Sequence, residues 1–121
     1  MARSKADIIR AIFAAYLAND RATIEAAFTD DFRFTSPFDD NLDKPAYFER
    51  CWKDAGWIKQ HELETIVTDG DAAFVSYHCI SRDDHSFRNT EFFQFAGDRV
   101  KRIEVYFGPS WQGGVFQPAA R

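Results

Sequence analysis

The stretch Glu91-Phe92-Phe93-Gln94-Phe95-Ala96-Gly97-Asp98-Arg99-Val100 contains the pattern that decides the fold of this 121-residue chain. Its apolar residues alternate, which predicts a strand, and Gly97-Asp98 predicts a turn into the next strand. The two-residue period of a strand puts Glu91 on the same face as Phe93 and Phe95. A carboxylate on a phenylalanine-rich face must be paired, protonated or in use, because an isolated buried charge is costly. Glu91 is therefore the first candidate functional residue.

Further strands are expected on both sides of this stretch. The strand over residues 88–96 is preceded by strands over 58–68 and 72–82, which are joined by the turn Asp69-Gly70-Asp71. A last strand is predicted over residues 100–108. Four consecutive strands joined by short turns predict an antiparallel meander.

The first half of the chain is predicted to be mainly helical. Apolar residues recur at helical spacing over residues 5–18, and Ser4 is suited to cap this helix. Asp20 caps a second, short helix and Asp43 a third, and between them a short strand over 32–37 ends at a proline. Helices followed by a meander indicate an α+β arrangement in which the helices cover one face of a curved sheet.

Composition narrows the range of functions. The length predicts a single domain over residues 1–121, with no regular element in the tail 109–121, whose apolar groups are expected to dock across a pocket mouth or on a partner subunit. Aromatic residues make up 17% of the chain, which indicates a lined cavity or a contact surface. The net charge of −4 argues against a nucleic-acid partner, and the absence of an apolar segment argues against a membrane, so a cytoplasmic location is expected. Cys51 and Cys79 lack metal-ligand spacing and are interpreted as reduced, buried thiols.

Short phrases in four places carry a resemblance to a known superfamily. They are Glu25-Ala26-Ala27-Phe28-Thr29-Asp30-Asp31-Phe32, Ala46-Tyr47-Phe48-Glu49-Arg50, Phe93-Gln94-Phe95-Ala96-Gly97 and Val105-Tyr106-Phe107-Gly108. In this order they resemble the nuclear transport factor 2-like (NTF2-like) superfamily, and within it the SnoaL-like branch, whose relatives include ketosteroid isomerase. The resemblance implies a cone of three N-terminal helices packed on a curved, mostly antiparallel sheet that encloses a pocket. Members isomerise, cyclise, dehydrate, hydrolyse epoxides or only bind, so the fold does not name a reaction.

Comparison with ketosteroid isomerase tests whether that particular reaction is expected. By the resemblance, Tyr16 matches a tyrosine on the first helix, and Glu91 lies where that family has a protonated aspartate. Ser36, before Pro37, occupies the position of the general base. A serine hydroxyl without an activating partner cannot remove a carbon-bound proton, because its pKa is too high. The chain is therefore not expected to be a standard ketosteroid isomerase.

His78 is the predicted replacement for the missing base. The family's orientation of the strand over 72–82 turns His78 and Phe74 toward the helices, and a loop at residues 83–86 sets a register that puts His78 nearly opposite Glu91. A His–Glu pair in an apolar cavity would hold the imidazole in one tautomer and raise its basicity. The alternative interpretation is a buried structural pair that fixes the register of the sheet.

The predicted pocket wall is largely aromatic and aliphatic. Its residues are Phe34, Ser36, Phe48, Trp52, Phe74, Phe93, Phe95, Ile103, Val105 and Phe107. The alternative for the apolar members is an ordinary core, and for Tyr16 a core position with its hydroxyl at the rim. Either His61-Leu63-Thr65-Val67 or Glu62-Glu64-Ile66 can face inward, and the first set is favoured because it is more apolar. His61 would then lie near the open end of the pocket, although a solvated strand end is the preferred interpretation, and His85 is expected to be exposed in a polar loop.

These observations predict a small-molecule pocket protein that isomerises, cyclises or dehydrates an apolar carbonyl or hydroxyl compound by proton transfer. The predicted catalytic residues are Tyr16, His78 and Glu91, with no metal and no other cofactor. The alternative is a non-catalytic module of the same fold that binds a ligand or another protein. A patch of Phe92, Tyr77 and Tyr106 is expected on the outer face of the sheet and predicts a homodimer through that face.

Overall fold

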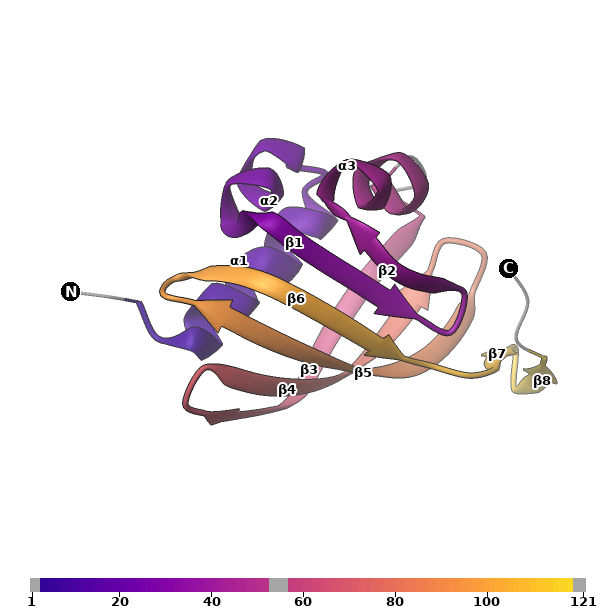
Figure 1. Cartoon of the computed structure of the whole chain (residues 1–121). Helices are drawn as coiled ribbons and strands as arrows, with labels where there is room; N and C mark the ends of the chain where they lie inside the picture. The colour runs from indigo at the N-terminus through magenta and orange to yellow at the C-terminus, as the bar shows by residue number, and fades with distance from the viewer. Residues whose placement is uncertain (1–2, 53–56, 119–121) are drawn as a thin grey trace.

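The helices of this protein cover one face of a curved sheet. The computed structural model describes residues 3–52 and 57–118 (Figure 1). Its helical segments are α1 (Lys5–Leu17), α2 (Arg21–Ala27), α3 (Lys44–Tyr47) and a π-helical turn (Phe48–Trp52). Its strands are β1 (Phe28–Ser36), β2 (Asp39–Asp43), β3 (Ile58–Asp69), β4 (Ala72–Ser81), β5 (His85–Ala96), β6 (Arg99–Tyr106), β7 (Ser110–Gln112) and β8 (Val115–Gln117). The predicted α+β class is confirmed.

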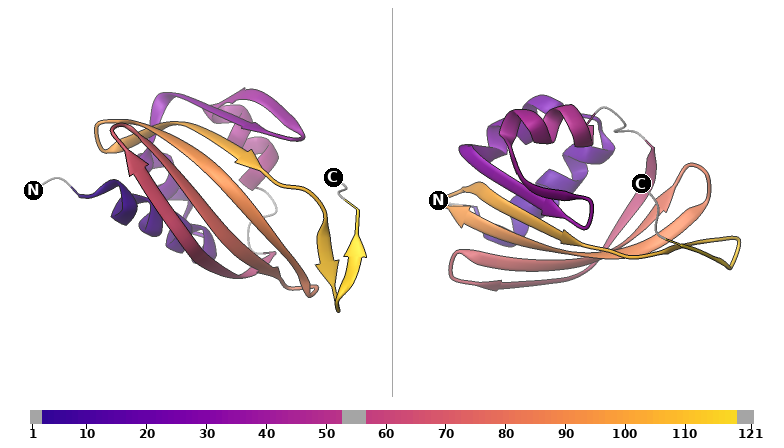
Figure 2. Two further views of the ribbon diagram at one scale, coloured as in Figure 1. Left: turned by 90° about the horizontal axis from the view of Figure 1, so that it is seen from below. Right: turned by 45° about the vertical axis from the view of Figure 1, so that its right-hand side comes forward.

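The sheet is mostly antiparallel, as predicted. Its strands follow the order β2-β1-β6-β5-β4-β3, and β1 pairs in parallel with β6 while the other neighbours on this path are antiparallel. The sheet curves toward the helices (Figure 2). The three helices do not all precede the sheet: α3 follows the β1–β2 hairpin, in line with the short strand predicted between the second and third helices.

Side-chain caps define where the helices begin. The Oγ of Ser4 accepts a hydrogen bond from the Asp7 backbone N–H at 3.1 Å at the start of α1. At the start of α2, the Asp20 carboxylate accepts a hydrogen bond from the Thr23 backbone N–H at 3.2 Å. Such caps satisfy backbone donors that have no partner inside the helix, and each contributes about 1 kcal/mol.

The core lies between the helices and the concave face of the sheet. Phe28 and Phe32 are fully buried, and their rings stack with centroids 4.0 Å apart. Ile9 of α1, Ile24 of α2 and Val75 of β4 are also fully buried. Burying one such side chain stabilises the fold by about 1.5–3 kcal/mol. This packing fixes α1 and α2 over the sheet.

The β4–β5 hairpin has a shorter connection than the sequence predicted. The buried hydroxyl of Ser81 accepts a hydrogen bond from the His85 backbone N–H at 3.0 Å, and its one O–H is shared between Asp83 Oδ1 and the His85 carbonyl oxygen, which lies 3.2 Å away. Asp84 has a φ of 63°, the left-handed conformation that closes a three-residue connection. Strand β5 therefore begins at His85 rather than at residue 88.

The shorter connection determines which side chains face the helices. Val75 lies opposite Glu91, and His78 lies opposite Arg88. Opposed residues share a face, so the odd-numbered residues of β4 face inward with Glu91. The predicted orientation of this strand, with His78 and Phe74 toward the helices, is wrong.

The C-terminal tail forms a small hairpin, although no regular element was predicted there. Strands β7 and β8 are joined at Gly113 and Gly114, whose φ values of 55° and 79° suit a two-residue turn. Strand β7 also pairs with the start of β5 at His85 and Ser86. Within the described residues, no helix is long and apolar enough to span a membrane.

Candidate functional site

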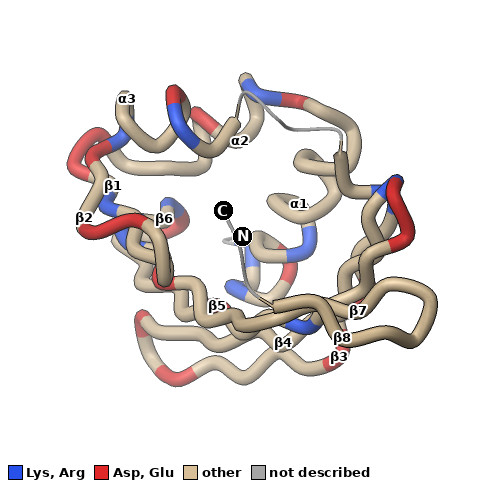
Figure 3. Tube along the Cα trace, turned by 90° about the vertical axis from the view of Figure 1, so that its right-hand side faces the viewer, with Lys and Arg blue, Asp and Glu red and all other residues tan. Residues whose placement is uncertain are grey.

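A cavity of about 250 Å³ lies between the helices and the concave face of the sheet. Figure 3 views this arrangement from the side of the β7–β8 hairpin, with the helices above and the sheet below. We call the cavity between the helices and the sheet the inner cavity. Its lining residues are Ile12, Phe13, Tyr16, Phe34, Tyr47, Cys51, Trp57, Ile58, His61, Tyr77, Cys79, Phe87, Asn89, Glu91, Phe93, Ile103 and Val105.

Glu91 places a carboxyl group in this largely apolar wall, as its position beside Phe93 predicted. Glu91 is partly buried and lines the cavity. Burial raises the pKa of Glu91 from 4.5 to about 7, and a hydrogen bond from the Tyr77 hydroxyl acts in the opposite direction. Near neutral pH the carboxyl group therefore has both its protonated and its charged form available.

A short chain of hydrogen bonds runs from Asn89 to Glu91. Asn89 Nδ2 donates to the Tyr77 hydroxyl oxygen at 3.0 Å, and the Tyr77 O–H donates to Glu91. Tyr77 and Asn89 are neighbours across the β4–β5 ladder, which brings their side chains together on the inner face. Burial and the nearby Glu91 raise the pKa of Tyr77 well above 10, so its hydroxyl keeps its proton.

Tyr16 reaches the same cavity from α1. Its ring packs on Trp52 with centroids 5.1 Å apart. Burial, followed by the charges of Glu91 and Cys51, raises the pKa of Tyr16 well above 10. The predicted meeting of Tyr16 and Glu91 in one cavity is what the structure shows, and the Tyr16 hydroxyl is a hydrogen-bond donor there.

His61 also faces the inner cavity, on the face that the sequence favoured. Its ring makes edge contacts with Phe13 and Tyr77, with centroids 5.1 and 5.7 Å apart. Burial lowers the pKa of His61 to about 4, and a hydrogen bond to the Phe13 backbone opposes this shift. The imidazole is therefore neutral at physiological pH. The predicted alternation fails beyond Leu63, where a β-bulge places Ile66 rather than Thr65 opposite the inward-facing Val75.

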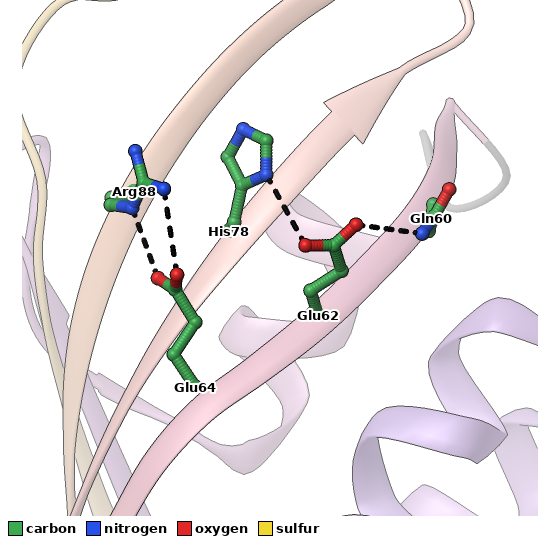
Figure 4. A network of polar contacts seen from close by, with 5 residues as sticks. All are labelled: Gln60, Glu62, Glu64, His78 and Arg88. Atoms are coloured by element: carbon green, nitrogen blue, oxygen red, sulfur yellow. Dashed lines mark hydrogen bonds and ion pairs between the residues drawn. The ribbon is translucent and has the colours of Figure 1, made fainter.

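His78 lies on the outer face of the sheet. Its Nδ1 is 3.7 Å from Glu62 Oε2, and the other carboxylate oxygen, Oε1, accepts a hydrogen bond from Gln60 Nε2 at 2.9 Å (Figure 4). Beside this pair, Arg88 binds Glu64 at 3.0 Å. These polar contacts cross strands β3, β4 and β5 on the side away from the helices.

The predicted pair of His78 and Glu91 is therefore wrong. In a hairpin whose opposed residue numbers have an even sum, even positions share a face with even positions. His78 and Glu91 must then lie on opposite faces, and His78 cannot serve as a base in the inner cavity.

The predicted pocket wall is correct in part. Phe34, Phe93, Ile103 and Val105 line the inner cavity. Phe107 lines a second cavity of about 510 Å³, which we call the outer cavity. The two cavities share Trp57, Phe87 and Asn89, and the outer one is bordered by the β7–β8 hairpin through Ser110 and Gln117. The expectation that the apolar groups of the tail dock across a pocket mouth is wrong, because Trp111, Val115 and Phe116 are about half exposed and do not line the outer cavity.

The remaining predicted wall residues lie elsewhere. Phe74 is on the outer face and 49% exposed, because the orientation of β4 is the reverse of that predicted. Ser36 belongs to the β1–β2 turn, where its hydroxyl accepts from the Phe38 N–H at 3.1 Å and donates to Asp39 at 3.2 Å. Three others are core residues that do not line the cavity: Phe48, Trp52 and Phe95.

Sequence reasoning missed the polar partners of Glu91. Asn89 precedes Glu91 by one strand period, so the same alternation that selected Glu91 also selects Asn89. Tyr77 was assigned to the opposite face. Cys79 is buried beside the cavity, and burial raises the pKa of its thiol to about 12, which keeps it protonated and unreactive.

His85 is only partly exposed, contrary to expectation. It lines the outer cavity, and its Nδ1 lies 3.0 Å from Asp83. Within residues 3–52 and 57–118, no three His, Cys, Asp or Glu side chains gather as a metal site requires.

Comparison with known proteins identifies relatives of this fold. The family model described as "SnoaL-like domain" matches residues 9–103. A solved NTF2-like protein of unknown function from Cytophaga hutchinsonii shares 13% identity and a TM-score of 0.71, with 88% of this chain and 92% of that chain covered. A Kribbella flavida protein with a provisional assignment as a ketosteroid isomerase shares 18% identity and a TM-score of 0.74, with 97% of this chain and 84% of that chain covered.

An LEH-like epoxide hydrolase of M. tuberculosis shares 19% identity and a TM-score of 0.67, covering 84% of this chain and 80% of that chain. At these identities the likeness establishes the fold alone. No curated protein matches the sequence.

Proposed function

The chain belongs to the SnoaL-like domain family, and we propose that its inner cavity binds a small, largely apolar compound and that Glu91 transfers a proton to or from it. The compound carries a carbonyl or hydroxyl oxygen. The reaction class is isomerisation, cyclisation or dehydration, as expected from the sequence, but with Glu91 in the role that His78 was predicted to have.

The observation that carries this proposal is the environment of the Glu91 carboxyl group. Among the described residues that line the inner cavity, Glu91 is the one carboxylate. Burial raises the pKa of this carboxyl group to about 7, so its charged and protonated forms are both populated near neutral pH. General acid–base catalysis is most efficient when the pKa of the catalytic group lies near the operating pH.

The proton-transfer step can be written for a carbonyl compound. The Glu91 carboxylate takes a proton from the carbon next to the carbonyl, the C–H electron pair forms a C=C bond, and the carbonyl π pair moves to oxygen. Tyr16 donates a hydrogen bond to this oxygen and stabilises its charge. The protonated Glu91 returns its proton to carbon and completes the cycle. Tyr77 positions Glu91 through its hydrogen bond.

Solvent deuterium exchange tests the proposal without knowledge of the natural substrate. The protein is incubated in D₂O with 1-indanone, cyclohexanone or acetophenone, and deuterium beside the carbonyl is measured by mass spectrometry. We expect exchange above the buffer rate, a loss of about 10²-fold or more in Glu91→Gln, and a smaller loss in Tyr16→Phe. Tyr106→Phe, which alters an exposed tyrosine on the outer face, is the matched control.

Two outcomes contradict a catalytic role for Glu91. Exchange that is unchanged in Glu91→Gln would exclude it as the proton-transfer group. Binding of these ketones without exchange would favour the alternative, a non-catalytic ligand-binding module with the same cavity.

A further inference from the structure

Two buried polar atoms of the inner cavity have no hydrogen-bond partner among the described residues. They are His61 Nδ1 on β3 and Asn89 Oδ1 on β5. A buried polar atom without a partner is destabilising, and native structures retain few of them. Both side chains line the same cavity.

The His61 atom is an acceptor. The hydrogen bond of His61 to the Phe13 backbone raises the pKa of the imidazole, so in that bond a ring N–H donates to a carbonyl oxygen. Because Nδ1 has no partner, the donating nitrogen is Nε2. A neutral imidazole carries one proton, and Nδ1 therefore has a lone pair without a hydrogen-bond donor among the described residues.

The Asn89 atom is also an acceptor. Tyr77 uses its O–H on Glu91, so its oxygen can only accept from Asn89. The group of Asn89 that contacts Tyr77 must then be the NH₂ group, which fixes the orientation of the amide. The carbonyl Oδ1 is left without a donor.

The sheet separates the two acceptors. His61 lies opposite Cys79, and Asn89 lies opposite Tyr77, one inward-facing pair further along the β4 ladder. Strands β3 and β5 are two strand spacings apart, about 10 Å, and one inward pair corresponds to about 7 Å along a strand. Donor groups that satisfy both atoms must come from separated positions of a ligand.

We propose that the inner cavity recognises a neutral, largely apolar compound with two separated hydroxyl groups, one donating to His61 Nδ1 and the other to Asn89 Oδ1. This inference rests on the proposed small-molecule function and names the substrate class of the same site. The apolar wall around these atoms, which includes Phe13, Phe87 and Phe93, supplies no donor in their place. A compound with acceptor oxygens alone leaves both atoms unpaired and binds less tightly.

The test compares three related probes by NMR titration. The first is 4-(hydroxymethyl)phenol, whose hydroxyl groups are far apart. Its dimethyl ether keeps both oxygens but has no donor, and 2-(hydroxymethyl)phenol has its donors side by side. We expect 4-(hydroxymethyl)phenol to bind at least about tenfold more tightly than the ether and more tightly than the 2-isomer.

Variants show whether the preference comes from the two acceptors. His61→Phe keeps a ring against Phe13 and Tyr77, and we expect it to reduce the affinity for 4-(hydroxymethyl)phenol about tenfold while leaving that for the ether unchanged. His78→Phe, the same substitution on the outer face, is the control and keeps the preference. In the unaltered protein, the ¹⁵N resonance of His61 Nδ1 is that of an unprotonated nitrogen, and it shifts when the hydroxyl compound binds.

The outcomes separate this inference from the proposed function. Equal binding of the hydroxyl compound and its ether, or an equal loss for both in His61→Phe, overturns the donor requirement and leaves the proton-transfer proposal standing. An unchanged Nδ1 resonance at saturation has the same consequence. A failure of all three probes to bind in the inner cavity also overturns the donor requirement, whereas the proton-transfer proposal is decided separately by deuterium exchange into the ketones.

Discussion

Burial raises the pKa of Glu91 and lowers the pKa of His61, and in both residues it favours the uncharged form. Removing water disfavours the charged form of each group, so the pKa of Glu91 rises to about 7 and the pKa of His61 falls to about 4. At neutral pH, His61 is an uncharged acceptor, and Glu91 is the group that gains or loses a proton. The different roles of the two residues follow from their burial beside the cavity, not from the usual pKa of a glutamate or a histidine.

The raised pKa of Glu91 predicts how folding stability changes with pH. Between its unfolded value near 4.5 and its folded value near 7, the folded state binds more protons than the unfolded state, so rising pH lowers stability. Above pH 7 the charged carboxylate destabilises the fold by about 3 kcal/mol relative to the protonated form. We therefore expect Glu91→Gln to be more stable than the wild type above pH 7, and the advantage to disappear near pH 4.

Urea denaturation of both proteins between pH 4 and pH 8.5 measures this difference. Exposed residues titrate equally in the two proteins, and subtraction removes their contribution. A stability difference that stays constant over this range would contradict a buried, protonatable Glu91.

At the level of elements, the sequence predicted which strands exist more reliably than how β4 and β5 pair. Periodicity predicted both strands and the inward position of Glu91, because these depend only on local alternation. The orientation of His78 and Phe74 depended on a loop length, and the Ser81 hydroxyl shortened that loop by bonding the backbone of His85. The alternation of apolar residues does not reveal this contact between the Ser81 hydroxyl and the His85 backbone. Two of the predicted site residues, His78 and Phe74, were therefore misplaced through one turn.

The importance of Ser81 for this turn can be measured directly. Ser81→Ala removes a buried hydroxyl that serves the backbone N–H and carbonyl of His85, and it also removes the hydrogen bond to Asp83. We expect a loss of about 2 kcal/mol in unfolding free energy, because the His85 N–H is left without that partner. Ser76→Ala, on the outer face of the same strand, is the control and should change stability by less than about 0.5 kcal/mol. Equal effects of the two substitutions would contradict this account of the hairpin.

At the level of the whole molecule, the outer face of the sheet carries exposed apolar side chains. Phe74 packs against Phe92 with ring centroids 5.1 Å apart, and Val67, paired with Phe74, is 57% exposed. Tyr106 on β6 is 56% exposed, whereas Tyr77, which the sequence placed on this face, points inward. We propose that a second copy of the chain covers this face, because contiguous apolar surface is uncommon on monomers.

Sedimentation equilibrium tests the proposed homodimer. We expect the wild type to sediment as a dimer and Phe74→Glu with Phe92→Glu to sediment as a folded monomer, because charges on a buried interface are costly. Trp111→Glu, an exposed aromatic on β7 away from this patch, is the control. A wild-type protein that is monomeric at high concentration would rule out the dimer.

The central claim is that the protonatable Glu91 of the inner cavity moves protons of a bound compound. The most direct measurement is the rate of deuterium exchange into 1-indanone as a function of pH. If the Glu91 carboxylate is the base, the rate rises with pH through an inflection near 7, where the carboxyl group loses its proton, and this inflection is absent in Glu91→Gln. A profile without this inflection, or one that Glu91→Gln leaves unchanged, would contradict the claim.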